Sequence, residues 1–233
     1  MPTGIYVAYT GATSAKSELD IIASNVANAS TTGYRRDQAT FDTVLGAAMP
    51  FSRVSSGQLD LTPGAHQHTK NPLHAAIDGD GFFVVQGPDG NELFTRRGDF
   101  RLNAEGQLVL PNGQAVLGEG GALTIPPGSN AVLSGNGTLV SDTGPVGRLR
   151  MVRFSEPAEL SKAGGSLIAA GHGAGLEEIE NPQIGVGFVE ASNVNLSAEM
   201  VALILATRAF EASMQSIRIN DQLTQQLIQT QNQ

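Results

Sequence analysis

Apolar residues recur at both ends of this chain with the seven-residue repeat that is typical of paired helices. Near the start, apolar residues follow one another at alternating spacings of three and four. They are Ile5, Ala8, Ala12, Ala15, Leu19, Ile22 and Val26. Near the end, the same spacing joins Leu196, Met200, Leu203, Thr207, Phe210, Met214 and Ile217. Helices with such stripes can lie side by side, so the sequence predicts ends that pair as a coiled-coil-like axial domain.

The middle of the chain changes to the pattern of short strands. Between residues 79 and 118, apolar runs alternate with turn residues at intervals of roughly 8–10 positions. The turn signals are Pro88-Asp89-Gly90, Arg97-Gly98-Asp99, Ala104-Glu105-Gly106 and Asn112-Gly113. This spacing is typical of antiparallel sheets. The sequence therefore predicts an α+β protein in which a mainly antiparallel β domain is inserted between the two terminal helices.

These patterns divide the chain into four expected regions. They are an N-terminal axial helix with a hinge (1–36), an extended connecting arm (37–75), the β domain (76–187) and a C-terminal axial helix (188–233). The arm shows few signals of regular structure. The stripe of the first helix has only four large apolar residues, whose burial barely offsets the entropy lost on ordering the helix. We therefore expect the ends to be poorly ordered in a single subunit and to become firm on assembly.

The composition excludes several kinds of partner. The formal net charge is −8 and only 15% of the residues are charged, which argues against nucleic acid and against anionic membrane surfaces. No apolar run is long enough to span a bilayer, so membrane insertion is not expected. The first residues lack the basic start and apolar core of a cleaved signal peptide. Export, if it occurs, would need another route.

We find no residue pattern that predicts catalysis, a cofactor, a metal or a small-molecule substrate. The chain has no cysteine, and His66, His68 and His74 lie in the unpatterned arm, so we expect no metal site. Residues 78–81, "DGDG", fail the calcium-loop pattern and indicate a turn before a strand. The "RGD" of residues 97–99 indicates a hairpin turn. We expect a protein that is not an enzyme.

The segment "ASNVANASTTGYRR" (23–36) ends the first helix without a proline. Its Asn, Ser and Thr side chains compete for backbone hydrogen bonds, and Gly33 can adopt the left-handed conformation that reverses the chain. We therefore predict a hinge at residues 30–36. Arg35 and Arg36 would lie outside the apolar stripe, where they would either meet acidic groups of a neighbouring subunit or be solvated.

Four blocks of the sequence, in order, resemble the flagellar basal-body rod proteins, within the larger family of rod, hook and hook-associated axial proteins. The blocks are "ASNVANASTTGYRR" (23–36), "NPLHAAIDGDGFFVVQ" (71–86), "FTRRGDFRLNAEGQLV" (94–109) and "EASNVNLSAEMVALILATRAFEASMQSI" (190–217). The second block and the compact middle are most similar to the proximal rod members, with the distal rod members as near siblings. One departure is His74, where the family commonly has an acid, so a contact made by that acid cannot be carried over.

The resemblance implies a structural subunit that the flagellar type III apparatus exports and that polymerises into the periplasmic rod. Its partners would be copies of itself, other rod proteins and the export apparatus, and the rod would transmit motor torque to the hook. The expected assembly interface comprises Ile5, Leu19, Ile22, Val26, Met200, Leu203, Phe210, Met214 and Ile217. The expected hinge and family-motif residues are Asn25, Asn28, Thr31, Gly33, Tyr34, Arg35, Ser192, Asn193, Arg208 and Glu211.

Two alternatives remain. The chain could be a distal rod or another hook-family axial protein. It could also belong to a different class, as a secreted β-domain binding module that is dimerised by its helices. Carbohydrate binding usually needs a flat aromatic platform, and this chain has no Trp and only three Tyr.

Overall fold

The chain forms two compact units in a computed structural model that describes residues 3–45, 50–126 and 128–231. One unit, called here the helical unit, comprises Met1–Ala27, Asp37–Gln58 and Asn195–Gln233. The other, called the β unit, comprises Asn28–Arg36 and Leu59–Val194. Each unit is therefore built from segments that lie far apart in the sequence.

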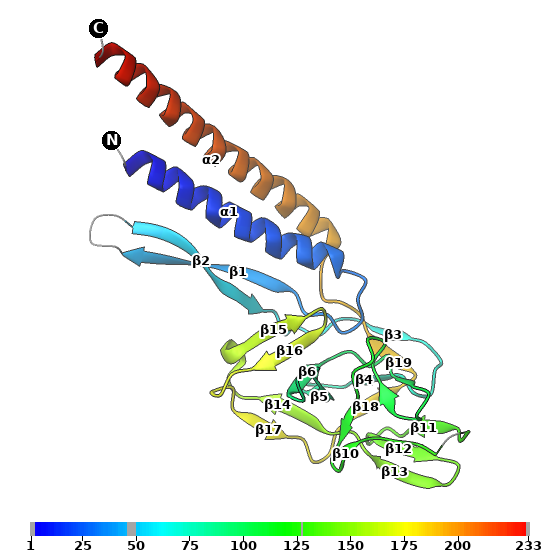
Figure 1. The fold of residues 1–233 in the computed structure, drawn as a ribbon. Coiled ribbons are helices and arrows are strands. Elements are labelled where there is room, and N and C mark those ends of the chain that lie inside the picture. Colours follow the sequence, from blue (N-terminus) through cyan, green and yellow to red (C-terminus); the bar gives the residue numbers. More distant parts are fainter. Residues whose placement is uncertain (1–2, 46–49, 127, 232–233) are drawn as a thin grey trace. The chain divides into compact units, whose positions relative to one another are not determined.

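The helical unit contains the two long helices, α1 (Thr3–Ala27) and α2 (Leu196–Gln231), and the two-stranded sheet of β1 (Asp37–Leu45) and β2 (Pro50–Leu59). The helices pack against each other and run in opposite directions (Figure 1). A Cβ atom at Gly11 would lie 3.3 Å from the Ser213 hydroxyl. No described helix is both long and apolar enough to cross a membrane.

The β unit consists of short strands, labelled in Figure 1. They are β3 (His66–His68), β4 (Ala75–Ile77), β5 (Phe82–Gln86), β6 (Glu92–Thr95), β7 (Arg101–Leu102), β8 (Leu108–Val109), β9 (Leu117–Gly118), β10 (Gly121–Ala122), β11 (Ala131–Leu133), β12 (Thr138–Ser141), β13 (Gly144–Arg148), β14 (Met151–Phe154), β15 (Leu160–Gly164), β16 (Leu167–Ala170), β17 (Leu176–Glu178), β18 (Ile184–Val186) and β19 (Phe188–Glu190). A 3-10 turn, Pro157–Glu159, precedes β15. The α+β class with mostly antiparallel sheets is confirmed.

A six-stranded antiparallel sheet, in the order β15-β16-β6-β5-β14-β17, forms the centre of the β unit. Its strand β5 is buried on both sides because its side chains alternate between two cores. Phe83 and Val85 join one apolar cluster, which extends over the hairpins of residues 100–149. Phe82 and Val84 join a second cluster on the opposite face. The continuous apolar run "FFVV" is the sequence pattern of a strand buried on both faces.

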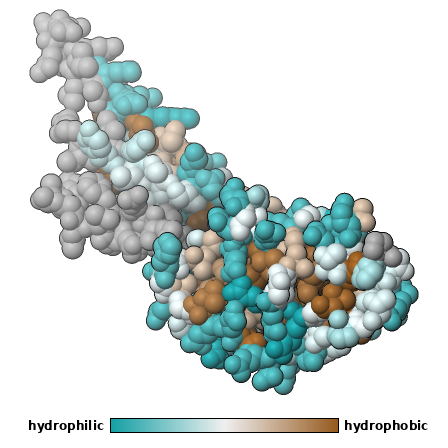
Figure 2. All heavy atoms as spheres, turned by 60° about the horizontal axis from the view of Figure 1, so that its bottom comes forward, coloured by the Kyte–Doolittle hydropathy of each residue, from teal (hydrophilic) through white to brown (hydrophobic). Residues whose placement is uncertain are grey.

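The predicted turns separate the strands of this unit. Gly90, Gly106 and Gly113 have φ of +78°, +77° and +89°, the left-handed region that favours glycine. On the face of the β unit seen in Figure 2, apolar residues form separate patches bordered by polar ones. Such scattered patches are normal for a folded surface.

The predicted connecting arm, residues 37–75, contains more regular structure than its sequence pattern indicates. It holds β1, β2, β3 and the first residue of β4. Residues 37–45 include β-branched and aromatic side chains, which favour strands. Polar and apolar side chains also alternate over residues 38–42, a short signal of a half-buried strand that the expectation of an arm without regular structure did not use.

Candidate functional site

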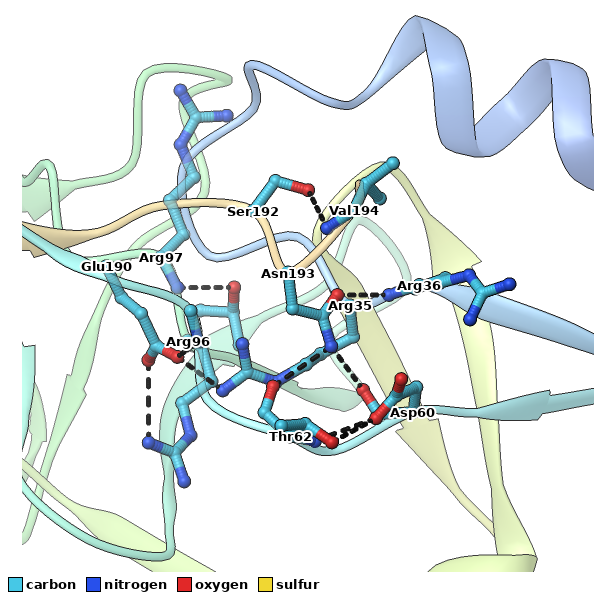
Figure 3. A network of polar contacts seen from close by, with 12 residues as sticks. Arg35, Arg36, Asp60, Thr62, Arg96, Arg97, Glu190, Ser192, Asn193 and Val194 are labelled. Atoms are coloured by element: carbon cyan, nitrogen blue, oxygen red, sulfur yellow. Dashed lines mark hydrogen bonds and ion pairs between the residues drawn. The ribbon is translucent and has the colours of Figure 1, made fainter. Parts of the chain in front are cut away.

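The two terminal motifs of the sequence meet inside the β unit. Figure 3 shows residues 35–36 lying beside the segment Glu190–Val194, with Asp60, Thr62 and Arg96 completing the group. The backbone N–H of Gly33 donates to the Glu190 carbonyl at 2.8 Å. Residues separated by more than 150 positions therefore form one polar junction.

The first motif ends α1 and reverses the chain. After Ala27, the N–H of Thr31 donates to the Asn28 carbonyl at 3.0 Å, and the Thr31 hydroxyl donates to the Asn28 side chain at 3.1 Å. Gly33 has φ of +66°, the left-handed conformation that the sequence analysis expects. A Cβ atom at Gly33 would also lie 2.3 Å from the Arg97 nitrogen. Gly33 is thus required both by its conformation and by the close approach of another backbone.

Glu190 is the acceptor at the centre of the junction, and its side chain is 0% exposed. One carboxylate oxygen accepts from Arg35 Nη2 at 2.7 Å and from the Gly64 N–H at 2.7 Å. The other accepts from Arg96 Nη1 at 3.5 Å. A buried carboxylate is tolerated when it is paired and hydrogen-bonded in this way.

The two arginines of the junction are almost as deeply buried, at 1% exposed for Arg35 and 4% for Arg96. Burial lowers the pKa of Arg96; the Glu190 carboxylate opposes this shift, and the like charge of Arg35 adds to it. The Arg96 guanidinium also lies 5.2 Å from the centre of the Phe82 ring. Arg35 Nε, Arg35 Nη1 and Arg96 Nε are buried without a hydrogen-bond partner in the described structure. Two cations therefore share one buried carboxylate.

The expectation for Arg35 is wrong in both of its forms. Arg35 is neither solvated nor available to a neighbouring subunit, because it is buried against Glu190 of its own chain. The stripe and turn patterns do not reveal long-range partners, so Glu190 and Arg96 were missed. The signal that could have drawn attention to them is that Glu190 and Arg96 both stand within family blocks, although these blocks contain other acids and arginines as well. Arg36 is partly buried, and its N–H donates to the Asn193 side chain at 2.7 Å.

Asn193 joins three backbone segments through its carboxamide. Its oxygen accepts the Arg36 N–H, and its NH2 group donates to the carbonyls of Asp60 and Thr62, each at 2.9 Å. Only a carboxamide offers an acceptor and two donors in one planar group. The neighbouring Ser192 accepts the Val194 N–H at 3.3 Å. The Ser192-Asn193 motif is therefore a local organiser of backbone.

Tyr34 is fully buried beside the junction. The Lys162 ammonium lies 3.8 Å from the centre of its ring, and its hydroxyl is also hydrogen-bonded to that ammonium. A cation over an aromatic face is attracted by the ring electrons. The motif residue Tyr34 thus fastens the first terminal segment to β15.

In the helical unit, the side chain of Asn25 joins several segments of the chain through hydrogen bonds, as Asn193 does in the β unit. The Asn25 side chain accepts the Asp37 N–H at 3.0 Å and donates to the Asp37 carbonyl at 2.9 Å, bracketing the intervening turn. It also donates to the buried Glu199 carboxylate at 3.3 Å. Asn25 therefore connects α1, β1 and α2.

The predicted interface residues lie on the helices as follows. On α1, Ile22 is buried, Leu19 and Val26 are partly buried, and the side chain of Ile5 lies outside the described residues. On α2, Leu203, Phe210, Met214 and Ile217 are partly buried, whereas Met200, Arg208 and Glu211 are exposed. The stripe of α2 is displaced by one residue at Thr207, which is exposed while Ala206 is buried. The role of these residues in assembly stays a prediction.

The remaining motifs have structural partners in the chain itself. Arg97 forms a two-bond ion pair with Asp99, at 2.6 and 2.9 Å, and Gly98 lies against the Ala75 carbonyl. The "RGD" side chains therefore pair with each other in the turn. His68 lies against Phe188, with ring centres 4.8 Å apart. Among the described residues, no three His, Asp or Glu side chains gather as they would around a metal ion.

Comparisons with known families match the same segments that form these features. Residues 5–35 match the flagella basal body rod protein family, residues 76–146 the flagellar hook protein FlgE/F/G D1 domain, and residues 186–230 the flagellar basal body rod FlgEFG protein C-terminal region. The first and third matches contain the two halves of the polar junction. The chain belongs to the flagellar basal-body rod protein family.

Whole-chain relatives agree with this assignment. The flagellar basal-body rod protein FlgF of Salmonella typhimurium is 33% identical, with 95% of each chain covered. FlgG of Buchnera aphidicola from Schizaphis graminum is 30% identical over 98% of this chain and 100% of its own. FlgF of Mesorhizobium japonicum is 34% identical over 99% and 98%. The protein is accordingly a structural component of the flagellar basal body, of a family without enzymatic activity.

Proposed function

We propose that this protein is a subunit of the proximal part of the rod, where it polymerises through its terminal helices with copies of itself and with other rod proteins. The flagellar type III apparatus would export it, and the rod would cross the periplasm and transmit torque to the hook. The relatives bear both the FlgF and the FlgG names at similar identity. The proximal position therefore rests on the second sequence block and the compact middle region.

The observation that carries the proposal is the apolar surface of α2. Several large apolar side chains of this helix are exposed although the helix packs against α1. They are Leu196, Met200, Val201, Ile204, Leu205, Ile219 and Leu223. Val201, Ile204 and Leu205 are 59%, 55% and 61% exposed. A helix that is apolar on more than one side is suited to neighbours on more than one side.

We further propose that α1 and α2 pair as a coiled-coil-like axial domain. Their antiparallel contact and the burial of Ala12, Ala15, Ile22 and Ala206 support this pairing. Small side chains at the contact allow the two backbones to approach closely. The outer face of α2 would then remain for neighbouring subunits.

Rod completion and swimming motility in cells test the proposal. Ile204→Asp places a charge where a neighbour's apolar surface would lie, so completed rods and motility should be lost. The matched control is Val132→Asp on β11, because Val132 is also apolar and exposed, at 49%. The control strain should swim. Normal motility of the Ile204→Asp strain would refute assembly through this face of α2.

A further inference from the structure

We propose that Arg35, Glu190 and Arg96 form a closing latch: residues 28–36 dock onto the β unit only when the segment 188–194 brings Glu190 into place. The inference rests on the proposed function in one respect. If the subunit is exported, it benefits from a fold that is completed only after both ends of the chain are present. The latch itself is a property of the β unit of one subunit. It can therefore be tested without forming a rod.

Glu190 is a shared partner of the segments around Gly33, Gly64 and Arg96. These segments also touch directly, because the Asp60 N–H donates to the Arg36 carbonyl at 2.9 Å and Gly33 lies against the Arg97 backbone. Its carboxylate binds Arg35, Arg96 and the Gly64 N–H, and its carbonyl accepts the Gly33 N–H. The strand that contains it, β19, is also the pairing partner of β3. Removing residues 188–194 would thus leave β3 without its paired strand, and Arg35 and the Gly33 N–H without their partner Glu190.

The docking of residues 28–36 depends on the negative charge of Glu190. Without Glu190, docking would bring the guanidinium groups of Arg35 and Arg96 together in a buried site. Three of their side-chain nitrogens have no hydrogen-bond partner in the described structure. The other carboxylate that acts on Arg96, that of Asp80, belongs to an exposed residue, so it is a weaker counter-charge than the buried Glu190. Buried like charges without a counter-ion are strongly unfavourable. The arrangement in which residues 28–36 are undocked and both guanidinium groups are hydrated would therefore have the lower free energy.

The backbone pairing of the central sheet is separate from the latch, although Arg96 lies over Phe82 of β5 and Tyr34 contacts Lys162 of β15. The six strands of the sheet pair with one another, and neither β3 nor β19 is among them. Opening of the latch should therefore be local, as expected for a cooperative subdomain with its own stability. Arg35 lies shortly after the end of α1 at Ala27, and Glu190 lies shortly before the start of α2 at Leu196. Closure therefore joins the two segments of the β unit that are connected along the chain to α1 and α2.

Hydrogen exchange on the full-length monomer tests the latch. In Glu190→Gln, which retains the shape but loses the charge, amides of residues 28–36 and of β3 should exchange roughly 100-fold faster. Amides of β5 should keep their protection. The matched control is Glu178→Gln, whose carboxylate pairs with Arg150 on the surface and is 60% exposed. In Glu178→Gln, the exchange rates of the same amides should stay within about fivefold of those in the unsubstituted protein.

Two further variants separate a latch from ordinary packing. Arg35→Gln leaves Glu190 paired with Arg96, so it avoids an uncompensated buried cation and should increase exchange in residues 28–36 alone. The triple variant Arg35→Met/Arg96→Met/Glu190→Met removes all three charges and should restore protection, because the penalty of unpaired burial disappears.

The latch would be overturned by unchanged exchange of residues 28–36 in Glu190→Gln, or by an equal loss of protection in β5 in both Glu190→Gln and Arg35→Gln. Failure of the triple variant to restore protection would also overturn it. None of these outcomes bears on whether Ile204→Asp blocks the rod. The latch and the proposed function can therefore fail independently.

Discussion

The two units of this protein bury very different side chains. The β unit encloses two apolar clusters with several phenylalanine, leucine and valine residues on both faces of its central sheet. Among the side chains of the helical unit whose burial is described, the buried apolar ones are Ala12, Ala15, Ile22 and Ala206. Because the gain from burial grows with the apolar area removed from water, the β unit has far more to stabilise it in a single subunit. Several larger apolar side chains of α2, such as Val201, Ile204 and Leu205, are exposed.

This difference connects stability with assembly. A unit with a large internal core can fold before it meets a partner. A unit whose core is mostly alanine gains its remaining burial from neighbouring subunits, as obligate assemblies do. The predictions that follow test this division of roles, beginning with the largest expected effect.

Hydrogen exchange on a proven monomer should separate the two units most clearly. Amides of residues 5–26 should exchange at least about 100-fold faster than those of β5, because the alanine-rich contact opens more readily than the sheet. Exchange read by mass spectrometry on the intact chain measures both regions in one sample. Strong protection throughout residues 5–26 would contradict the proposed dependence on assembly.

A charge in the helix contact should abolish assembly and spare the β unit. Leu19→Asp and Phe210→Asp each place a carboxylate in a partly buried apolar contact, at a cost of several kcal/mol. We expect loss of rod completion and motility, while the unfolding transition of the β unit stays unchanged. Completed rods in either strain would show that this contact is not needed.

A side chain at Gly33 should instead act on the β unit. Gly33→Val combines the strain of a positive φ with a clash against the Arg97 backbone, so the unfolding free energy should fall by more than about 3 kcal/mol. Gly90→Val is the matched control: its φ is +78° and nothing lies within 4 Å of the added Cβ. Gly90→Val should lower the unfolding free energy by the backbone strain alone, about 1–3 kcal/mol. If urea unfolding gives equal losses of unfolding free energy for Gly33→Val and Gly90→Val, the clash with the Arg97 backbone makes no contribution.

Exchanging the carboxamide of Asn193 for a carboxylate should have a smaller effect on the same unit. Asn193→Asp loses both donors and turns an oxygen toward the carbonyls of Asp60 and Thr62. Leaving such groups unpaired costs about 1–3 kcal/mol. The control is Asn112→Asp in an exposed turn, which should be nearly neutral. If the two variants unfold alike in denaturant, Asn193 does not organise the junction.

The smallest effect should come from His74. Burial lowers the pKa of His74 from its ordinary value of 6.5, and the Asp99 carboxylate partly opposes the shift. As the pH falls, His74 of the unfolded chain therefore binds a proton at a higher pH than His74 of the folded chain. The contribution of His74 to the free energy of unfolding is complete above the ordinary pKa and declines as the pH falls through and below it. Replacing the ring by His74→Gln should reduce the loss of stability between about pH 7 and about pH 5. An unchanged pH dependence in urea unfolding would rule this out.

Several features follow from the sequence alone, for local physical reasons. The stripes of apolar residues predict both helices, and the turn residues at Gly90, Gly106 and Gly113 predict the hairpins between strands. The end of α1 and the left-handed Gly33 follow from the competition of Asn, Ser and Thr for backbone hydrogen bonds. In each case the residues that carry the signal lie within a few positions of the structure that they determine.

The tertiary structure alone decided which distant groups share a site. Nothing near Arg35 in the sequence identifies Glu190 as its partner, and nothing near Asn193 identifies Asp60 or Thr62. The same holds for the stripe of α2, where Ala206 is buried and Thr207 is not, because the position of α1 selects the covered face. Periodicity reports what one segment prefers, whereas a buried charge is tolerated only where the whole fold brings its counter-charge.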